Sequence, residues 1–597
     1  MNSSPMTYRR LLFVYPDFDP TYWGMQHALP LVARKSLMPP LGLMTIAAMT
    51  PEQYEVRIVD MNCEPLTDEH IDWADMVLFS AMMMQQRTLF SAAQRCRKAG
   101  KPVVFGGPYP TSFTDECRPY CDYLVLNEGE VTWPMFLRDI QAGTLQPIYA
   151  SSVKPDVSKT PCPRFDLVNV ADYGMIPLQY SRGCPFQCEF CDIIVLYGRS
   201  PRTKTPAQML AELDALYATG YRGGVFIVDD NFIGNKKEVL QFLPEMERWN
   251  RKHGHPFQYG TEATLNLAED QRLLESVIRA GFLWVFIGIE TPDVAALKES
   301  RKLQNVRGSL VDRVRVLQNA GLLVFGGFIL GFDNETEDIF DRQIEFITQA
   351  AIPNAMVGQL GALPNTPLHE RMQREGRLLR SLTEADGLGP FYCNFRTTLS
   401  FETLVRGQRR ILETIYEPRA YFDRLLEAYR RLPKEKTLVR KLRRFLFPGG
   451  MVRGSKATGQ ARMLAQFTGK ARLAALVQFL RSVEPGFRRE ALRFVRKIVL
   501  ESPEHFQQSL DYLLTGYHYY LFTRDTVVPE YERVLADASA YPGLEPAETT
   551  PRDPAWTSST AGIVQIAIAT EAGSTSGAAY PRGDVPAHSG SALTVQS

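Results

Sequence analysis

The sequence predicts an α/β protein with two successive parallel β-sheets and a helical C-terminal region. Five short apolar runs alternate with helix-length segments before residue 150, and six more follow between residues 178 and 360. Such alternation is typical of parallel sheets, because a connecting helix must return the chain to the start of the next strand. Beyond about residue 400 the strand signal fades, and apolar residues recur at helical spacing until about residue 535.

Length and composition fit a globular chain of several domains. The chain has 597 residues, 45% of them hydrophobic and 22% charged, which corresponds to roughly three to four domains. We expect two α/β domains over 1–150 and 173–400, a linker over 151–172, a helical domain over 401–535 and a tail over 536–597. The tail is rich in Ala, Ser, Thr, Gly and Pro, so we expect it to be disordered.

The sequence shows no recognisable targeting or membrane-spanning segment. Its first residues are polar and lack the apolar core of a signal peptide, and no stretch reaches ~18 uninterrupted apolar residues. The nine cysteines are irregularly spaced apart from one cluster, so a disulfide framework is not expected. We therefore expect a cytoplasmic protein with reduced thiols.

The first sheet is predicted from five apolar runs. They are Leu11–Val14, Val56–Val59, Met76–Phe79, Val103–Phe105 and Tyr123–Leu126. Ligands of a doubly wound sheet bind beyond the carboxyl ends of its strands, so the loops that follow the strands are the candidate binding loops. The residues of interest in these loops are Ser80, Gly106, Gly107, Asn127 and Glu128. A tight strand-to-helix turn is the alternative explanation of the paired glycines.

The second sheet is predicted from six apolar runs. They are Leu178–Tyr180, Gly224–Val228, Phe257–Thr261, Trp284–Gly288, Val324–Ile329 and Ala355–Leu360. Amphipathic segments such as Pro206–Ala218 lie between them, with Pro206 suited to a first helical turn. Six such units predict a partial (β/α)6 barrel, whose site should lie at the carboxyl ends of the strands.

Cys184, Cys188 and Cys191 form a Cys-x3-Cys-x2-Cys motif directly after the first strand of this barrel. Three thiolates at this spacing can bind three irons of a [4Fe–4S] cube and leave the fourth iron open. A structural zinc site would need a fourth Cys or His nearby, and His253 and His255 fall in a later β/α unit. We expect a cluster site; zinc and unliganded thiols are the alternatives.

The motif resembles the three-cysteine loop of the radical S-adenosylmethionine (SAM) superfamily, including an aromatic residue before the last cysteine, here Phe190. The resemblance implies that the open iron binds SAM and that SAM is split to a 5′-deoxyadenosyl radical. It also implies SAM contacts on later strands, at Asp230, Glu262, Gly288, Glu290, Gly326 and Gly327. Carboxylates suit ribose hydroxyls and ammonium groups, and glycines admit a ligand close to the backbone. Ordinary barrel-end caps and turns are the alternative for these positions.

A doubly wound domain directly upstream of such a barrel resembles the cobalamin-binding domain of the cobalamin-dependent radical SAM enzymes. Pro39–Leu43, Val59–Asn62 and Asn127–Glu130 are similar to sequences of that domain. The resemblance implies a flavodoxin-like fold that binds cobalamin through the loops after its strands. The implied contact residues are Ser80, Gly106, Gly107, Asn127 and Glu128.

The lower-face ligand motif of classical cobalamin domains, Asp-x-His-x-x-Gly, is missing after the first strand. Asp68–Trp73 matches it in part but follows the second strand, so we expect His70 to be a surface residue. The resemblance then implies base-off cobalamin. Met82–Met84 lie where the lower face of the corrin is expected, and core packing is an equal alternative. Cys117 and Cys121 form a second Cys-x3-Cys pair, which we expect to be structural.

The two implied cofactors together imply a methyltransferase that acts on an unactivated carbon. The radical would remove a hydrogen atom, methylcobalamin would supply the methyl group, and a second SAM would remethylate the cobalamin. The cofactors carry this chemistry, so we assign no catalytic side chain. Stretches such as Tyr197–Arg199 and Gly288–Pro292 resemble the branch that contains the hopanoid C-2 methylase.

Relatives in that branch modify different molecules, so the resemblance does not fix the substrate. We expect a lipid or other hydrophobic natural product, and an electron donor such as flavodoxin or ferredoxin. A non-methylating C–C coupling, cyclisation or rearrangement with the same cofactors is the alternative enzyme activity. A cobalamin- or redox-responsive regulator is the alternative from another class.

The net charge of +1 conceals a strongly basic segment. Residues 430–497 contain 19 basic and 3 acidic side chains, so their net charge of +16 leaves −15 for the rest of the chain. Cations mixed with apolar residues at helical spacing, as in 438–447 and 487–497, are typical of helices that lie on an anionic membrane surface. A solvated helical face that balances an acidic domain is the alternative. Nucleic acid is not expected, because no recognition motif accompanies the charge.

Overall fold

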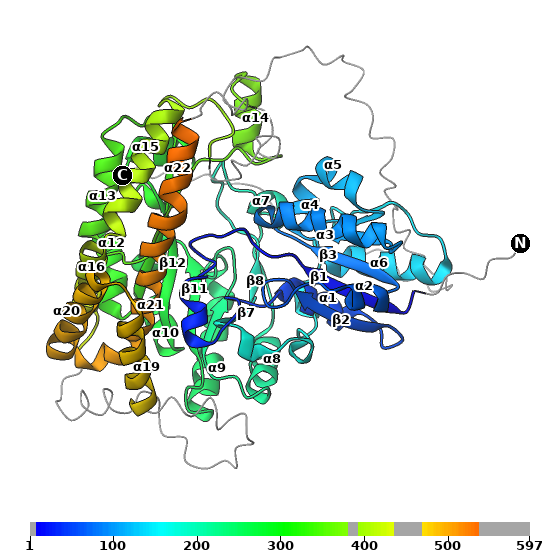
Figure 1. Cartoon of the computed structure of the whole chain (residues 1–597), viewed down its shortest axis with the longest axis horizontal. Helices are drawn as coiled ribbons and strands as arrows, with labels where there is room; N and C mark the ends of the chain where they lie inside the picture. Colours follow the sequence, from blue (N-terminus) through cyan, green and yellow to red (C-terminus); the bar gives the residue numbers. More distant parts are fainter. Residues whose placement is uncertain (1–7, 380–391, 435–468, 537–597) are drawn as a thin grey trace, which may run out of the picture. The chain divides into compact units, whose positions relative to one another are not determined.

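The computed structural model describes residues 8–379, 392–434 and 469–536 (Figure 1). Figure 1 shows the first sheet in blue, the second in green, and the C-terminal helices in yellow-green to orange beside the second sheet. Most of the predicted tail, residues 537–597, lies outside the described residues, as does the basic stretch 438–447.

The first sheet is parallel throughout, in the order β2-β1-β3-β4-β5-β6. Its strands are β1 (Arg10–Tyr15), β2 (Glu55–Asp60), β3 (Met76–Ser80), β4 (Val103–Gly106), β5 (Tyr123–Val125) and β6 (Ile148–Tyr149). The five predicted strands and the flavodoxin-like order are confirmed. The sixth strand was not predicted, because two residues carry no detectable period.

Helices cover both faces of this sheet, since alternate strand residues point to opposite sides. They are α1 (Leu41–Met49), α2 (Asp68–Trp73), α3 (Gln86–Lys98), α4 (Pro108–Ser112), α5 (Thr114–Cys117) and α6 (Gly129–Ala142). Phe13 packs with Trp133 of α6 and with α1 on one face. Leu12 and Val14 pack with α2 and α3 on the other. Cys117 and Cys121 are buried on that second face as free thiols.

The second sheet is also parallel, in the order β14-β13-β12-β11-β10-β7. Its strands are β7 (Met175–Leu178), β10 (Gly224–Ile227), β11 (Gln258–Ala263), β12 (Phe282–Glu290), β13 (Leu323–Leu330) and β14 (Ala355–Gln359). The two outer strands do not pair with each other, so the predicted open (β/α)6 barrel is confirmed. Its helices are α7 (Ile193–Leu196), α8 (Pro206–Ala218), α9 (Lys236–Lys252), α10 (Gln271–Arg279), α11 (Val294–Glu299), α12 (Leu310–Ala320) and α13 (Ile339–Gln349).

The first barrel strand ends earlier than the sequence predicts. The prediction placed it at Leu178–Tyr180, whereas β7 ends at Leu178. The backbone N–H groups of Tyr180 and Ser181 donate to the two carboxylate oxygens of Asp229, at 2.7 and 2.9 Å, in place of a neighbouring strand. Beyond this point β8 (Ser181–Arg182) pairs antiparallel with β9 (Arg202–Thr203). The chain therefore leaves the barrel just before the cysteine motif.

The C-terminal helices cover the open side of the barrel. They are α14 (Pro367–Arg374), α15 (Phe401–Ile415), α16 (Pro418–Arg431), α19 (Gly469–Ser482), α20 (Pro485–Glu501), α21 (Phe506–Phe522) and α22 (Val528–Ala536). In α15, the Gln408 side chain donates to the Val357 carbonyl of edge strand β14 at 2.9 Å. The neighbouring Gly407 lets α15 pack closely on α13, because a Cβ there would lie 2.2 Å from the Phe340 ring of α13. The bond satisfies a backbone group that an edge strand leaves unpaired.

Helix α20 is amphipathic, as its sequence predicts. Its aromatic side packs on α16, where Phe422 contacts the rings of Phe487 and Phe494. Its opposite side exposes Leu492 and Leu500, which are 48% and 71% accessible. Within the described ranges, no helix combines the length and the apolar character that a bilayer crossing requires.

Candidate active site

A cavity of about 2050 Å³ lies where the carboxyl ends of both sheets face the C-terminal helices. A pocket for one small molecule typically measures about 300–1,000 Å³, so this cavity has room for more than one ligand. Both sheets place the ends of their strands at this cavity, as their architectures require.

Every residue predicted to contact cobalamin lines this cavity. These residues are Ser80, Gly106, Gly107, Asn127 and Glu128. They lie at or just beyond the carboxyl ends of β3, β4 and β5, which are neighbours in the sheet. Gly107 has φ +93°, and a Cβ there would lie 2.6 Å from the Ser80 hydroxyl. Only glycine therefore fits at this position of the cavity wall, and it leaves the backbone open to a ligand. Asn127 is left-handed at φ +65°, a conformation that Asn tolerates better than most residues.

Met82, Met83 and Met84 also line the cavity, and Met82 is 49% accessible. No histidine of the described residues is part of its wall. His70 instead lies in α2, where its Nδ1 accepts from the Thr67 backbone N–H at 3.2 Å and completes a capping box. The structure thus gives His70 a local helix-capping role.

The cysteine loop leaves β8 through a glycine whose backbone has a positive φ. Gly183 has φ +95°, and its N–H donates to Asp230 Oδ2 at 2.9 Å. The Cys184 N–H donates to the Gly198 carbonyl at 3.2 Å. Cys188 is buried, and Asp192, which follows Cys191, lines the cavity. The start of the loop is therefore fixed, and the flanking residues Arg182 and Asp192 line the cavity, whereas the three cysteines do not.

Polar groups point at the cysteine sulfurs. Asn231 Nδ2 donates to Cys184 Sγ at 3.8 Å, and Gln304 Nε2 donates to Cys188 Sγ at 3.5 Å. The other amide atoms, Asn231 Oδ1 and Gln304 Oε1, are buried without a hydrogen-bond partner among the described residues. Hydrogen bonds to sulfur are the usual environment of an iron–sulfur cluster, so this donor set fits one.

No group of three or more His, Cys, Asp or Glu in the described ranges is gathered closely enough for a single metal ion. A cluster differs in this respect, because each thiol binds a different iron.

Lys302 is the principal residue here that the sequence did not reveal. Its Nζ lies 2.5 Å from Glu290 Oε1, and both side chains are buried. Burial alone would lower the pKa of Lys302, but Glu290 and the neighbouring Cys188 and Cys191 raise it, so the ammonium stays charged. A permanent cation beside thiolates stabilises negative charge at this position.

The predicted SAM residues divide into two groups. Asp230 and Glu262 line the cavity; Gly288, Glu290, Gly326 and Gly327 do not. A Cβ on Gly288 would lie 2.4 Å from Glu290 Oε1, so this glycine makes room for the ion pair with Lys302. Gly326 and Gly327 make room for the rings of Phe328 and Phe286. The SAM contacts of all six residues stay predictions.

Burial changes the protonation of the two acids that face the cavity. It raises the pKa of Asp230 to about 6 and that of Glu262 to about 8. Each lacks a cationic partner close enough to reverse the effect of burial, so a positive ligand would be attracted to their ionised forms. Asp229 has a different role, since its carboxylate binds the backbone of Tyr180 and Ser181.

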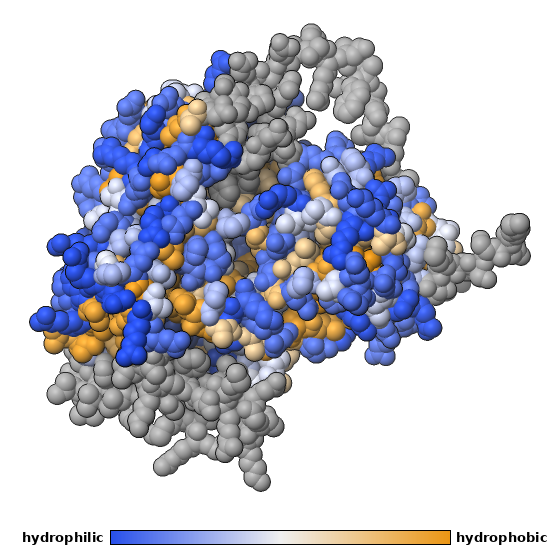
Figure 2. All heavy atoms as spheres, viewed as in Figure 1, coloured by the Kyte–Doolittle hydropathy of each residue, from blue (hydrophilic) through white to orange (hydrophobic). Residues whose placement is uncertain are grey.

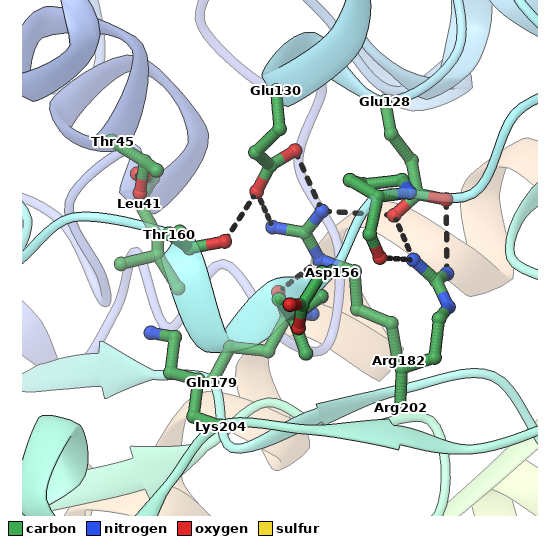
Figure 3. A network of polar contacts seen from close by, with 12 residues as sticks. Leu41, Thr45, Glu128, Glu130, Asp156, Thr160, Gln179, Arg182, Arg202 and Lys204 are labelled. Atoms are coloured by element: carbon green, nitrogen blue, oxygen red, sulfur yellow. Dashed lines mark hydrogen bonds and ion pairs between the residues drawn. The ribbon is translucent and has the colours of Figure 1, made fainter. Parts of the chain in front are cut away.

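An ion network joins the two α/β domains beside the cavity (Figure 3). Glu128 and Glu130, at the start of α6, bind Arg182 of β8 and Arg202 of β9. Glu128 was predicted as a cobalamin contact, and its carboxylate is occupied by these arginines. Neither arginine was identified from the sequence, because isolated cations carry no motif.

Comparison with known proteins agrees with this architecture. Family models match residues 29–137 (B12 binding domain), 178–347 (radical SAM superfamily) and 366–530 (domain of unknown function DUF4070). The chain is 44% identical over 431 residues to an uncharacterized methyltransferase of Synechocystis sp., covering 72% of this chain and 80% of that one. It is 39% identical over 381 residues to the hopanoid C-2 methylase of Rhodopseudomonas palustris, covering 63% and 72%.

Among solved structures, the cobalamin-dependent SAM radical enzyme OxsB, with aqua-cobalamin and SAM bound, is similar in fold. The TM-score is 0.53 at 15% identity, covering 89% of this chain and 81% of that one.

The first sheet matches a cobalamin-binding domain and the second a radical SAM barrel, and both sheets line one cavity beside the cysteine loop. These features define a radical enzyme with two organic cofactors and a cluster. The chain belongs to the cobalamin-dependent radical SAM enzymes, in the branch that includes the hopanoid C-2 methylase. It is a methyltransferase, and its cofactors are a [4Fe–4S] cluster, SAM and cobalamin.

The raised pKa of Glu262 predicts pH-dependent SAM binding. SAM carries a sulfonium charge, which favours the ionised carboxylate, so binding must release the proton that Glu262 retains below pH 8. Affinity should rise with pH by up to about tenfold per unit between pH 6 and 8, the slope of one linked proton. Anaerobic calorimetry of the reconstituted enzyme in two buffers of different ionisation enthalpy measures this release. Glu262→Gln should flatten the profile between pH 6 and 8, and a flat profile in the unaltered enzyme would contradict the prediction.

Proposed function

We propose that this enzyme methylates an unactivated carbon of a lipid or other hydrophobic natural product. When bound, the cofactors supply a hydrogen-abstracting radical and a cobalt-bound methyl group. The chain positions these cofactors and excludes water. The observation that carries the proposal is the group of aromatic and aliphatic side chains that the N-terminal segment, the barrel and the C-terminal helices contribute to the cavity wall, here called the apolar arm.

This arm is built from parts of the chain that are far apart in sequence. The residues that line it are Trp23, Phe226, Met356, Leu412, Phe522, Val527 and Tyr531. Tyr22 holds the N-terminal segment against the helices, because its hydroxyl lies 2.7 Å from the Thr523 hydroxyl. Thr523 begins a π-helical turn, an irregularity that is frequent at functional sites. Aromatic and aliphatic walls favour an apolar ligand.

Polar side chains also line this part of the wall, among them Gln26, Gln408, Glu530 and Arg533. Gln26 lines the cavity, and both atoms of its amide are buried without a hydrogen-bond partner among the described residues. A buried amide without partners is unfavourable, so the group favours a ligand that supplies them. We infer that the substrate carries a hydroxyl or similar polar group on a largely apolar body.

For the cofactors, we propose that Cys184, Cys188 and Cys191 bind the cluster and that Asp230 and Glu262 face SAM. Donors directed at the sulfurs and acids buried at the cavity wall support this assignment. Ser80, Gly106, Gly107 and Asn127 would contact cobalamin, and their common place on the cavity wall supports this. An electron donor such as flavodoxin or ferredoxin would reduce the cluster in the cytoplasm.

We also propose contact with the surface of an anionic membrane through the basic segment 430–497. The outward side of α20 exposes Leu492, Val499 and Leu500 together with Arg489 and Arg496. In Figure 2, hydrophobic surface in orange lies over the part of the molecule that carries α19 and α20, at the lower left. Cations beside aliphatic residues suit an anionic bilayer, from which an apolar substrate would be drawn.

Incubation with methyl-labelled SAM tests the proposed substrate class. The reconstituted, reduced enzyme is given a bacterial lipid extract in vesicles with or without anionic lipid. Label should enter an apolar product, and faster with anionic vesicles, because each cation near the headgroups contributes about 1 kcal/mol. Mass spectrometry of the extract is the measurement. Label confined to water-soluble products would contradict the lipid assignment, and equal rates on both vesicles would contradict the membrane contact.

A further inference from the structure

The ion network between the two α/β domains connects the two cofactor loops directly (Figure 3). Arg182 Nη1 lies 3.0 Å from Glu128 Oε2, and Arg182 Nη2 lies 2.7 Å from Glu130 Oε1. Arg202 Nη2 lies 2.9 Å from Glu128 Oε1. One guanidinium thus bridges two acids, and one acid bridges two guanidiniums.

The network is mostly buried, and Glu128, Glu130 and Arg182 also line the cavity. The accessible fractions of the side chains are 2% for Glu128, 11% for Glu130, 14% for Arg182 and 18% for Arg202. Thr160 of the linker donates a further hydrogen bond to Glu130 at 2.9 Å. Buried charges stabilise only when their geometry is well satisfied, and forked guanidinium–carboxylate bonds fix direction as well as distance. Such a network therefore resists small displacements of one domain against the other.

Each end of the network lies next to a cofactor loop. Glu128 is the N-cap residue of α6 and follows Asn127, which faces the cavity where cobalamin is proposed to bind. Arg182 is followed directly by Gly183 and Cys184, the start of the cysteine loop. Glu128 and Arg182 are 54 positions apart in sequence, so the intervening chain alone does not fix their separation.

We propose that Arg182 is a positioning residue, which through Glu128 and Glu130 sets the distance and angle between the cobalamin-facing loop and the cysteine loop. Both cofactors must reach the same substrate carbon, one to remove hydrogen and the other to deliver methyl. A misplacement of about 1 Å can cost about 10²-fold in rate, so a rigid link between the loops has a direct catalytic value.

Electron paramagnetic resonance of the holoenzyme tests the proposal without any lipid substrate. The enzyme is loaded with iron, sulfide and cobalamin and partly reduced, so that cob(II)alamin and the reduced cluster coexist. Their magnetic coupling falls with distance. Arg182→Lys keeps the positive charge but loses the paired hydrogen bonds of the guanidinium group. Glu130→Gln keeps the shape of the side chain but loses its negative charge. Both variants should give a weaker coupling or a broader distribution of coupling strengths. The separate spectra of cobalamin and of the cluster should stay as in the unaltered enzyme.

The double variant and a control make the test specific. Arg182→Lys with Glu130→Gln should change the coupling no more than the larger single change, because each single variant already breaks the contact between Arg182 and Glu130. Arg248→Gln removes an exposed pair with Glu245 on α9, far from the network in sequence, and should leave the coupling unaltered. An unaltered coupling in both network variants, an equal change in the control, or no coupling in the unaltered enzyme would overturn the proposal.

A second readout separates positioning from general damage. The methylated product formed per 5′-deoxyadenosine should fall by about 10-fold to 100-fold in Arg182→Lys. A purely structural defect would lower both products together and leave their ratio unchanged, which would also overturn the proposal. If no lipid is methylated by the unaltered enzyme, the proposed substrate class fails, whereas the magnetic coupling still decides the role of Arg182.

Discussion

Replacing Cys188 with alanine is expected to leave a folded protein that cannot hold its [4Fe–4S] cluster or form 5′-deoxyadenosine. Cys188 is buried in the loop between Cys184 and Cys191, and its sulfur accepts a hydrogen bond from Gln304. With two thiols remaining, the cube loses a protein ligand at one of its three occupied corners. Iron analysis, the visible spectrum after anaerobic reconstitution, and deoxyadenosine formed on reduction with SAM are the measurements.

Cys121→Ala is the matched control, since it also removes a buried thiol from a Cys-x3-Cys pair. The Cys121 thiol donates to the Cys117 carbonyl at 3.5 Å and is buried in the core of the first domain. This variant should bind the same amount of iron as the unaltered enzyme. Deoxyadenosine formation by Cys188→Ala, or loss of iron by Cys121→Ala, would show that the ligands are assigned wrongly.

Replacing Gly183 with alanine should disrupt the cysteine loop and destabilise the barrel by about 4 kcal/mol, the sum of left-handed backbone strain and overpacking. Gly183 has φ +95°, and a Cβ there would lie 2.8 Å from the Gly198 carbonyl oxygen and 3.2 Å from that of Ser200. These are backbone atoms, which cannot move aside as a flexible side chain can. Urea unfolding and cluster content after reconstitution measure the two effects.

Gly198→Ala is the control that separates backbone strain from the steric collision of a Cβ with neighbouring atoms. Gly198 is also left-handed, at φ +84°, but the nearest atom to its Cβ would be the Lys154 side chain at 4.0 Å. Only the conformational cost of about 1 kcal/mol applies, so this variant should keep its cluster. Equal losses of stability in the two variants would mean that the collision at Gly183 is relieved by a shift of the loop.

The regular elements could be predicted from the sequence because burial on both faces makes parallel strands continuous apolar runs. The prediction located α8 at Pro206–Ala218, where a Thr205 capping box and Pro206 mark the start. It misplaced the end of β7, because the bond between Asp229 and Ser181 replaces strand pairing there. A contact across 48 positions leaves no local signal in the sequence.

The site was only partly predictable, because contacts between residues far apart in the sequence leave no local pattern. The cysteine spacing is a local pattern and was recognisable, whereas Lys302 reaches the cysteines only through the folding of the barrel. Gly326 and Gly327 show the reverse difficulty. A glycine in the sequence indicates that space is needed but not what occupies it, and here aromatic rings do. Glu128 was recognised as a loop residue, but its arginine partners depend on how two domains pack.

Helix α15 binds the edge strand of the barrel through Gln408, so the C-terminal helices form part of the cavity wall without belonging to the barrel. The cofactor loops belong to the two α/β domains, while the far wall of the cavity comes from the C-terminal helices and the segment around Trp23. Under the proposed function this wall contacts the acceptor, and the C-terminal helices that form part of it are encoded apart from the cofactor loops. Recombination that exchanges the helical stretch can present a new molecule to an unchanged radical source, so new methylated products can evolve without rebuilding the chemistry.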